Sequence, residues 1–186
     1  MKKIYSAFFS ACILAFSLSA QGQNSDVPVK TIPSLDVQQY LGVWYEIAKY
    51  PNWFQKKCVS NTKAVYSARA DGTLKVLNSC KTANGEVSEA EGTARQLGAK
   101  DSPKLEVRFA PAWLSFIPMV WGDYWVIDLD PQYQVAVVSD PRREYLWILS
   151  RTPQLDKKVY EDTLARIQAQ QFDIRKREPT LQVTAK

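Results

Sequence analysis

The stretch of sequence that decides the fold is Leu41-Gly42-Val43-Trp44-Tyr45-Glu46-Ile47-Ala48. Its glycine lets the backbone bend or pack closely, and the residues that follow are strand formers in an alternating run. Because strand side chains alternate between faces, we expect Trp44, Glu46 and Ala48 on the inner face. Tyr45 and Ile47 then lie on the outer face. A strand that is apolar on both faces, with one carboxylate turned inward, is typical of a barrel wall that surrounds a cavity.

Composition narrows the classes of function. The chain has 186 residues, which is the size of one domain, and it contains no histidine. The lack of histidine excludes Ser-His-Asp and Cys-His nucleophiles and His-ligated zinc, and we predict neither a metal site nor a cofactor. Without Lys2 and Lys3 of a signal segment, 22 basic residues face 19 acidic ones, a net charge of +3. That charge is too small to indicate a nucleic-acid partner.

The two ends of the chain differ from its body. Residues 1–22 have a charged start, an apolar middle and small residues before a cleavage point, which predicts a secretory signal peptide. A lipid-modified N-terminus at Cys12 is the alternative, although its apolar region would be short. Residues 23–35 form a predicted leader, residues 36–176 the domain, and residues 177–186 a solvated tail.

Short strands and turn signals fill the body of the chain, at the spacing of an antiparallel barrel or sandwich. Asp71-Gly72 and Asn84-Gly85 are hairpin signals. A closed barrel of eight strands is either filled by side chains or holds one small ligand. We therefore predict an all-β, eight-stranded antiparallel up-and-down barrel. After the strand at Gly42, the other seven predicted strands are residues 59–69, 73–80, 87–96, 104–109, 124–129, 133–139 and 145–150.

The hydrophobic period changes near residue 152, which predicts one C-terminal α-helix packed outside the barrel. Thr152 is a suitable N-cap and Pro153 a suitable first helical residue. A short edge strand is expected at residues 172–174, and a turn of helix that ends at Tyr40 is expected to precede the first strand, capped by Ser34 or Asp36. The apolar residues at helical spacing are Leu155, Val159, Tyr160, Leu164 and Ile167.

Two loops are rich in apolar side chains. Trp53 and Phe54 follow a break at Pro51 and are expected to cross the mouth of the barrel. Residues 110–120 are nearly all apolar, and their prolines disfavour a central strand. We expect this second loop to fold into the core or over the barrel opening. The alternative is a lip that touches a membrane or gates the ligand.

These features together resemble the lipocalin family, and most of all the outer-membrane lipocalins of bacteria, the subgroup that includes apolipoprotein D. The resemblance covers residues 36–174 and is most specific in the run Leu146-Trp147-Ile148-Leu149-Ser150-Arg151-Thr152-Pro153. It implies structural roles for Gly42 and Trp44, for Asp130 in a partly matched second motif, and for Arg151. A guanidinium from Arg151 stacked on Trp44 would close one end of the barrel.

Two cysteines, Cys58 and Cys80, remain once the signal segment is removed. In a secreted chain they predict a disulfide, which would close a loop of 22 residues and contribute about 3 kcal/mol. The alternative is a reactive thiol, as in the one lipocalin that is an isomerase.

The ligand pocket follows from the resemblance together with strand alternation. The resemblance implies ligand contacts at Tyr66, Asn78, Tyr124 and Trp147, and the other expected pocket residues are Glu46, Val76, Val126, Val135, Val137 and Tyr145. Such a tube suits a fatty acyl chain, since each buried methylene contributes about 0.8 kcal/mol. Because Glu46 repels an anionic head group, it favours a head group that stays at the mouth or is cationic. Side chains that fill the barrel completely are the alternative.

The sequence thus predicts a protein without enzymatic activity that binds, stores or transports a hydrophobic ligand. The resemblance implies a fatty acid or lysophospholipid and a role in outer-membrane maintenance, in the periplasm or outer membrane of a Gram-negative bacterium. A membrane surface is a further candidate partner. One alternative is a lipocalin-fold enzyme that acts on a lipid through a thiol or carboxylate. The other is a filled barrel that serves as an interaction scaffold, with a homodimer formed through residues 110–120.

Overall fold

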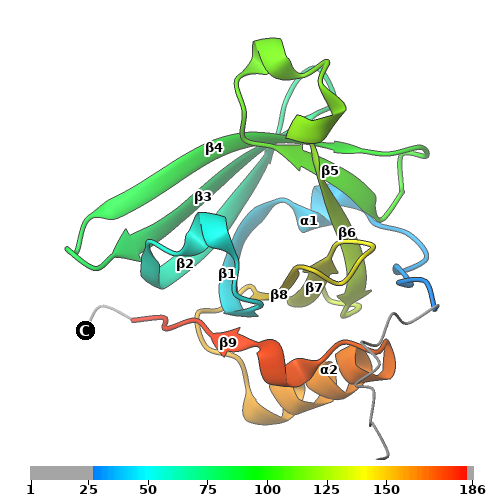
Figure 1. Cartoon of the computed structure of the whole chain (residues 1–186). Helices are drawn as coiled ribbons and strands as arrows, with labels where there is room; N and C mark the ends of the chain where they lie inside the picture. The colour runs from blue at the N-terminus through cyan, green and yellow to red at the C-terminus, as the bar shows by residue number, and fades with distance from the viewer. Residues whose placement is uncertain (1–26, 184–186) are drawn as a thin grey trace, which may run out of the picture.

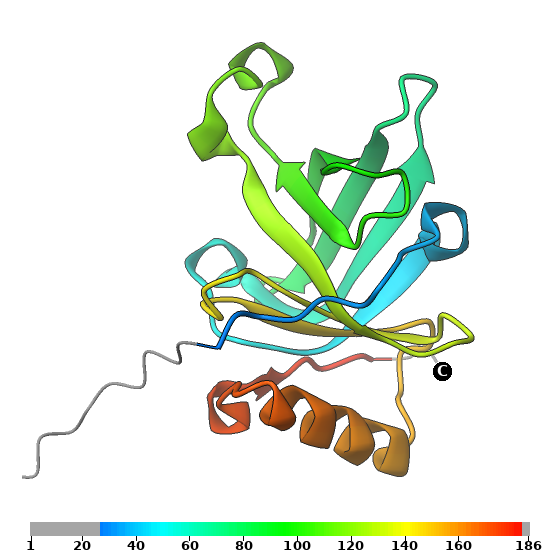
Figure 2. The same ribbon diagram turned by 90° about the vertical axis from the view of Figure 1, so that its right-hand side faces the viewer.

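The computed structural model describes residues 27–183, so the predicted signal segment and Cys12 lie outside the described residues. Its strands form one sheet that closes into a barrel, because β1 pairs with β8 on one side and with β2 on the other (Figures 1 and 2). The elements in chain order are α1 Val37–Tyr40, β1 Gly42–Lys49, β2 Cys58–Ala68, β3 Leu74–Thr82, β4 Val87–Gln96, β5 Lys104–Arg108, β6 Gly122–Leu129, β7 Val135–Ser139, β8 Leu146–Ser150, α2 Lys157–Ala169 and β9 Glu178–Pro179.

Strands β1 to β8 confirm the predicted eight-stranded antiparallel up-and-down barrel, since each pairs with the next along the chain. The hairpin turns at Gly72 and Gly85 need the left-handed backbone that glycine tolerates, with φ of +82° and +85°. Strand β9 is an addition that the sequence did not predict. It pairs with the end of β1, where Lys49 lies opposite Glu178.

Helix α2 packs under one side of the barrel, as Figure 1 shows, and buries Leu164 and Ile167 against outward-facing strand residues. It begins four residues later than predicted from Pro153, because the Asp156 carboxylate caps it by accepting the backbone N–H of Val159 at 3.1 Å. The edge strand predicted at residues 172–174 is wrong. Phe172 is instead buried between the barrel and α2, in an outer cluster that includes Ile127, Val137, Ile148, Leu164 and Ile167.

The closed end of the barrel is solid. The guanidinium of Arg151 lies 3.9 Å from the ring centroid of Trp44 and donates to the carbonyls of Gln39 and Val43 at 2.7 and 2.9 Å. The indole N–H of Trp44 donates to the Tyr40 carbonyl at 2.8 Å. Helix α1, which Asp36 caps as expected, therefore sits across this end beside the fully buried Leu35.

The turn between β6 and β7 is organised by Asp130. Its carboxylate accepts the backbone N–H groups of Gln132, Gln134 and Val135 at 2.9, 2.6 and 2.5 Å. Next to this turn, the carbonyl of Tyr133 accepts a hydrogen bond from Nε of Arg151 at 3.1 Å. The Asp130 turn and the Arg151 stack are therefore parts of one closed end.

Residues 178–183 contact the barrel, although the sequence assigned them to a solvated tail. The backbone N–H of Thr180 donates to Ile47 in β1 at 2.9 Å, and the N–H of Asn61 in β2 donates to Leu181 at 2.8 Å. Gln182 donates from its amide to the carbonyls of both Glu46 and Thr62, at 2.8 and 2.7 Å. The C-terminal segment thus bridges β1 and β2 where these two strands are no longer paired with each other.

None of the helices within residues 27–183 has the length and apolar character needed to cross a membrane.

Candidate ligand-binding site

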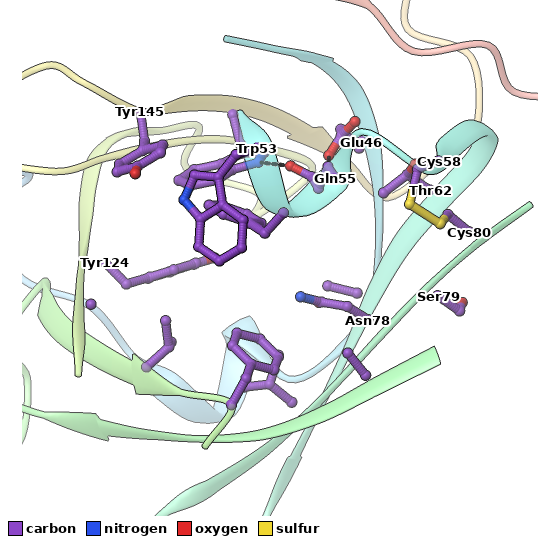
Figure 3. Close-up of a pocket in the computed structure, with 18 of the residues that line it drawn as sticks. Glu46, Trp53, Gln55, Cys58, Thr62, Asn78, Ser79, Cys80, Tyr124 and Tyr145 are labelled. Carbon is purple, nitrogen blue, oxygen red and sulfur yellow. Dashed lines mark hydrogen bonds between the residues drawn. A yellow bond between two sulfur atoms is a disulfide. The ribbon is translucent and has the colours of Figure 1, made fainter. Parts of the chain in front are cut away.

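A cavity of about 670 Å³ lies inside the barrel (Figure 3). Trp44 and Arg151, at the closed end, are not among its lining residues. Its lining is mainly apolar, and it opens between the loop at Trp53 and the loop that contains Met119. The barrel is therefore hollow at one end, and the alternative of a completely filled barrel is wrong. The solid half below the cavity is the inner cluster that contains Tyr40, Trp44 and Leu105.

Seven of the ten expected pocket residues lie on the cavity wall, namely Glu46, Tyr66, Val76, Asn78, Tyr124, Tyr145 and Trp147. Val126 faces the interior but is fully buried in the inner cluster below the cavity. The structure does not bring Val135 and Val137 into the site.

The placement of Val135 and Val137 corrects the expectation from strand alternation. Val137 packs in the outer cluster with Leu164 of α2. In the register between β7 and β8, Val138 lies opposite Trp147, and Val138 faces the interior. All four residues 135–138 are apolar, because one face of β7 meets the inner cluster and the other meets the helix. Their sequence alone does not indicate which face is which.

Four aromatic side chains form one wall near the mouth. Phe54 lies 5.7 Å from Tyr145 and 6.3 Å from Trp147 between ring centroids, and Tyr145 stacks on Trp147 at 5.8 Å. Trp53 contacts Phe54 edge-to-face at 5.6 Å and is itself largely exposed. The sequence placed Trp53 and Phe54 in a loop across the mouth, but nothing in their spacing indicated contact with β8.

Gln55 anchors this mouth loop to the wall. Its side-chain oxygen accepts the indole N–H of Trp147 at 3.0 Å and the amide of Asn52 at 2.6 Å. Its amide group donates to Oε2 of Glu46 at 2.7 Å, as Figure 3 shows. Sequence reasoning missed Gln55, because a polar residue in a loop carries no signal of such a role.

Glu46 is buried on the inner face of β1, as expected, and each of its carboxylate oxygens has a protein donor. Thr180 donates its hydroxyl to Oε1 at 2.5 Å, and Gln55 donates to Oε2. Burial raises the pKa of Glu46, and the two donors oppose that rise.

Ala48 does not lie on the inner face with Glu46, although strand alternation predicted that it would. The register of β1 against β8 shifts between Glu46 and Ala48, and Ala48 packs in the outer cluster.

Three tyrosine hydroxyls meet where the cavity ends and the solid half of the barrel begins. The hydroxyl of Tyr66 donates to that of Tyr124 at 2.8 Å, and the hydroxyls of Tyr124 and Tyr40 lie 2.9 Å apart. Tyr66 and Tyr124 line the cavity, whereas Tyr40 lies below it. Burial raises the pKa of all three phenols, to about 12 for Tyr66. The cavity floor therefore presents neutral hydroxyl groups at physiological pH.

Residues 110–120 stand out from the rim between β5 and β6, as Figures 1 and 2 show. They form two short 3₁₀ helices, Ala112–Leu114 and Pro118–Val120. Trp113, Phe116 and Met119 are 73%, 78% and 93% exposed, so the expectation that this loop folds into the core is wrong. The other part of that expectation, a position at the barrel opening, agrees with the structure, since Met119 and Val120 line the cavity. Contact with a membrane and gating of the ligand stay predictions. At its base, Trp121 stacks under Arg95 at 4.1 Å from ring centroid to guanidinium carbon.

The predicted disulfide between Cys58 and Cys80 is present and lies at the cavity wall (Figure 3). It joins the start of β2, just after the mouth loop, to β3. The alternative of an enzyme with a reactive thiol at either position has no thiol to use when this bond is formed.

Comparisons with known proteins agree with this geometry. A family model described as a lipocalin-like domain matches residues 35–182. Temperature-induced lipocalin-1 of Arabidopsis thaliana is 42% identical over 156 residues, which cover 83% of each chain. The outer membrane lipoprotein Blc of Escherichia coli K12 is 38% identical over 149 residues and 80% of each chain. Apolipoprotein D of Mus musculus is 32% identical over 79% of each chain.

Solved structures share the fold at low sequence identity. Insecticyanin from the tobacco hornworm Manduca sexta superimposes with a TM-score of 0.64 at 21% identity, over 82% of this chain and 83% of that chain. Apocrustacyanin C2 superimposes with a TM-score of 0.63 at 15% identity, over 80% and 81% of the two chains. At such identities the likeness concerns the fold alone.

Proposed function

Because the chain belongs to the lipocalin family, whose members in general bind or transport hydrophobic ligands, we propose that it carries a fatty acid or a lysophospholipid. The observation that supports this proposal most is the cavity of about 670 Å³ with its mainly apolar lining. A pocket of this size and character buries an acyl chain with a favourable contribution of about 0.8 kcal/mol for each methylene.

We propose that the head group of the ligand stays at the mouth, where the charged side chains of the lining include cations. Lys57 and Arg142 contribute to the cavity lining from the two loops that flank the aromatic wall, together with the acidic Glu89, Asp123 and Asp140, and Arg142 is paired with Glu144. Cationic side chains there complement a carboxylate or a phosphate. The carboxylate of Glu46 is already held by Gln55 and Thr180, so we propose no contact between Glu46 and the head group. The acyl chain then extends past Tyr145 and Trp147 toward the tyrosine floor.

Tryptophan fluorescence tests this proposal, because Trp53, Trp121 and Trp147 line the cavity. Titration of the mature protein with oleate, and separately with a lysophosphatidylcholine, should produce saturable changes near one equivalent. In the Trp147→Phe variant, which keeps the aromatic wall, the change should be smaller, because the part of the signal that arises from Trp147 is lost. No saturable change with either lipid would contradict the proposal.

We further propose that the protein is exported and acts at a membrane, in the periplasm or at the outer membrane of a Gram-negative bacterium. The disulfide favours an oxidising compartment. Several similar proteins are outer membrane lipoproteins by name, including that of Vibrio cholerae at 35% identity. The exposed apolar side chains of residues 110–120 provide a surface that suits lipid contact at the cavity mouth.

A further inference from the structure

The three tyrosines at the cavity floor have more hydroxyl protons than the hydrogen bonds between them require. Tyr40, Tyr66 and Tyr124 carry three O–H groups, and two hydrogen bonds connect them. Each hydrogen bond consumes one proton. One phenol of the three is therefore left with a donor that no other phenol accepts.

Burial indicates which phenol carries the remaining proton. Tyr66 donates to Tyr124, so the remaining proton belongs to either Tyr40 or Tyr124. Tyr40 is 1% exposed and lies in the solid half of the barrel, where a donor without an acceptor is costly. Tyr124 lines the cavity. The lower-energy arrangement has Tyr40 donating to Tyr124, which leaves the proton of Tyr124, a residue of the cavity wall, free for a ligand.

The surroundings of the Tyr124 hydroxyl indicate which chemical group of a ligand it would bind. In the described part of the chain, the partners of the Tyr124 hydroxyl are the two other phenols, and no cationic side chain contacts it. Arg151, at the closed end of the barrel, stacks on Trp44 and donates to backbone carbonyls. A buried carboxylate needs several donors or a counter-ion, whereas a hydroxyl, ketone or ester oxygen needs only one.

We propose that Tyr124 donates a hydrogen bond to a neutral oxygen at the buried end of the ligand, so that the preferred cargo is a fatty acyl chain oxygenated near its far end. This inference rests on the proposed function, because it assumes that an acyl chain enters with its head group at the mouth. It adds that the floor distinguishes an oxygenated chain end from a plain methyl end. Desolvation raises the pKa of Tyr124, which keeps the donor protonated throughout the physiological range.

Matched ligand pairs test the inference. Dodecanoate, tetradecanoate and hexadecanoate are each compared with their ω-hydroxy counterparts by isothermal titration calorimetry. The series of lengths ensures that one chain end reaches the floor. For at least one length, the ω-hydroxy acid should bind about fivefold more tightly, the factor that corresponds to one net hydrogen bond. Equal or weaker binding of every ω-hydroxy acid, with normal binding of the plain acids, would overturn the inference and leave the proposed function intact.

Two variants isolate the hydroxyl of Tyr124. Tyr66→Phe removes a phenol that donates to Tyr124 and should keep the preference for the ω-hydroxy acid. Tyr66→Phe combined with Tyr124→Phe differs from it by one hydroxyl and should lose the preference, measured as the ratio of the affinities for the two acids of a matched pair. The Tyr66 change is present in both because, without Tyr124, the Tyr66 hydroxyl itself could serve the ligand. A preference that survives in the double variant would contradict the assignment.

A measurement on the wild-type protein covers the case in which the double variant does not fold. A fatty acid with a ¹³C-labelled ketone near its far end is bound, and its carbonyl stretch is recorded by infrared spectroscopy. A hydrogen bond from a phenol should lower that frequency relative to the same ketone in hexane. An unshifted band in the bound state would overturn the inference, and no binding of any acid at all would instead contradict the proposed function.

Discussion

The hydroxyl of Thr180 donates a hydrogen bond of 2.5 Å to Oε1 of Glu46, across a separation of 134 residues. Glu46 in turn accepts from Gln55, and Gln55 accepts from Trp147. The C-terminal segment is thereby connected, through one buried carboxylate, to the mouth loop and to an aromatic residue of the cavity wall. The segment that contains Thr180 was expected to be a solvated tail, but it stabilises the binding site through these hydrogen bonds.

Replacing Thr180 with valine should lower the free energy of unfolding by about 1–3 kcal/mol, because a buried carboxylate oxygen loses its donor while the shape of the side chain is kept. Thr180→Ser, which retains the hydroxyl, is the matched control and should lose much less. Urea denaturation of the two variants measures the difference. Equal stabilities would show that the hydroxyl of Thr180 does not support Glu46.

The stability of the protein should depend on pH through Glu46. Burial raises the pKa of Glu46 in the folded state. For a raised pKa, the stabilising contribution is fully present below the unfolded pKa and is lost as the pH rises through the folded value. Acidification from about pH 7 to about pH 4 should therefore stabilise the wild type relative to Glu46→Gln, which does not titrate.

The measured quantity is the difference in unfolding free energy between wild type and Glu46→Gln at the two pH values. Contributions from the other carboxylates cancel in this difference. A difference that stays constant, or that moves against the wild type on acidification, is the contradicting result.

Arg151→Lys should cost about 1–3 kcal/mol of stability although the charge is conserved. Lysine cannot stack a planar cation on Trp44 while it donates to three carbonyls, those of Gln39, Val43 and Tyr133. Urea denaturation measures the loss, and Arg142→Lys at an exposed position is the control. If the two variants were equally stable, the stack would not hold the closed end.

The barrel and its closed end could be predicted from the sequence because they depend on local patterns. The alternation of side-chain types predicted the strands, and Asp71-Gly72 and Asn84-Gly85 predicted two hairpin turns. The run that ends at Pro153 carried the resemblance to the lipocalin family. The predicted start of α2 was four residues too early, because Thr152 and Asp156 are both good N-caps. Only the path of the chain after β8 selects Asp156.

The site was less predictable, because its correct residues depend on contacts between distant segments. The face of β7 could not be read from four consecutive apolar residues, so Val137 was expected in the cavity and lies under α2 instead. The roles of Gln55 and Thr180 arise only when the mouth loop and the C-terminal segment meet at Glu46. The exposure of Phe116 and Met119 agrees only with the alternative given for this loop, since an apolar run by itself predicts burial.

The lip at residues 110–120 should increase binding to a lipid surface. Replacing Trp113, Phe116 and Met119 together with serine removes most of its exposed apolar side chains. Co-sedimentation with vesicles of phosphatidylethanolamine and phosphatidylglycerol should fall at least about threefold. Val87→Ser changes an exposed apolar residue elsewhere and should have little effect. Equal sedimentation of the two variants would contradict the proposed role of the lip.

The central claim, that the cavity holds the acyl chain, is tested most directly by blocking it from within. Asn78 lies on the cavity wall, as Figure 3 shows, so Asn78→Trp places an indole in the space proposed for the chain. Val87→Trp adds the same side chain at an exposed position and is the matched control. Oleate binding is measured by isothermal titration calorimetry, with circular dichroism as the check on folding. The account predicts binding near one equivalent for the wild type and Val87→Trp, and affinity at least about tenfold lower for Asn78→Trp, since a filled pocket loses several methylene contacts. Undiminished binding by a folded Asn78→Trp variant would contradict it.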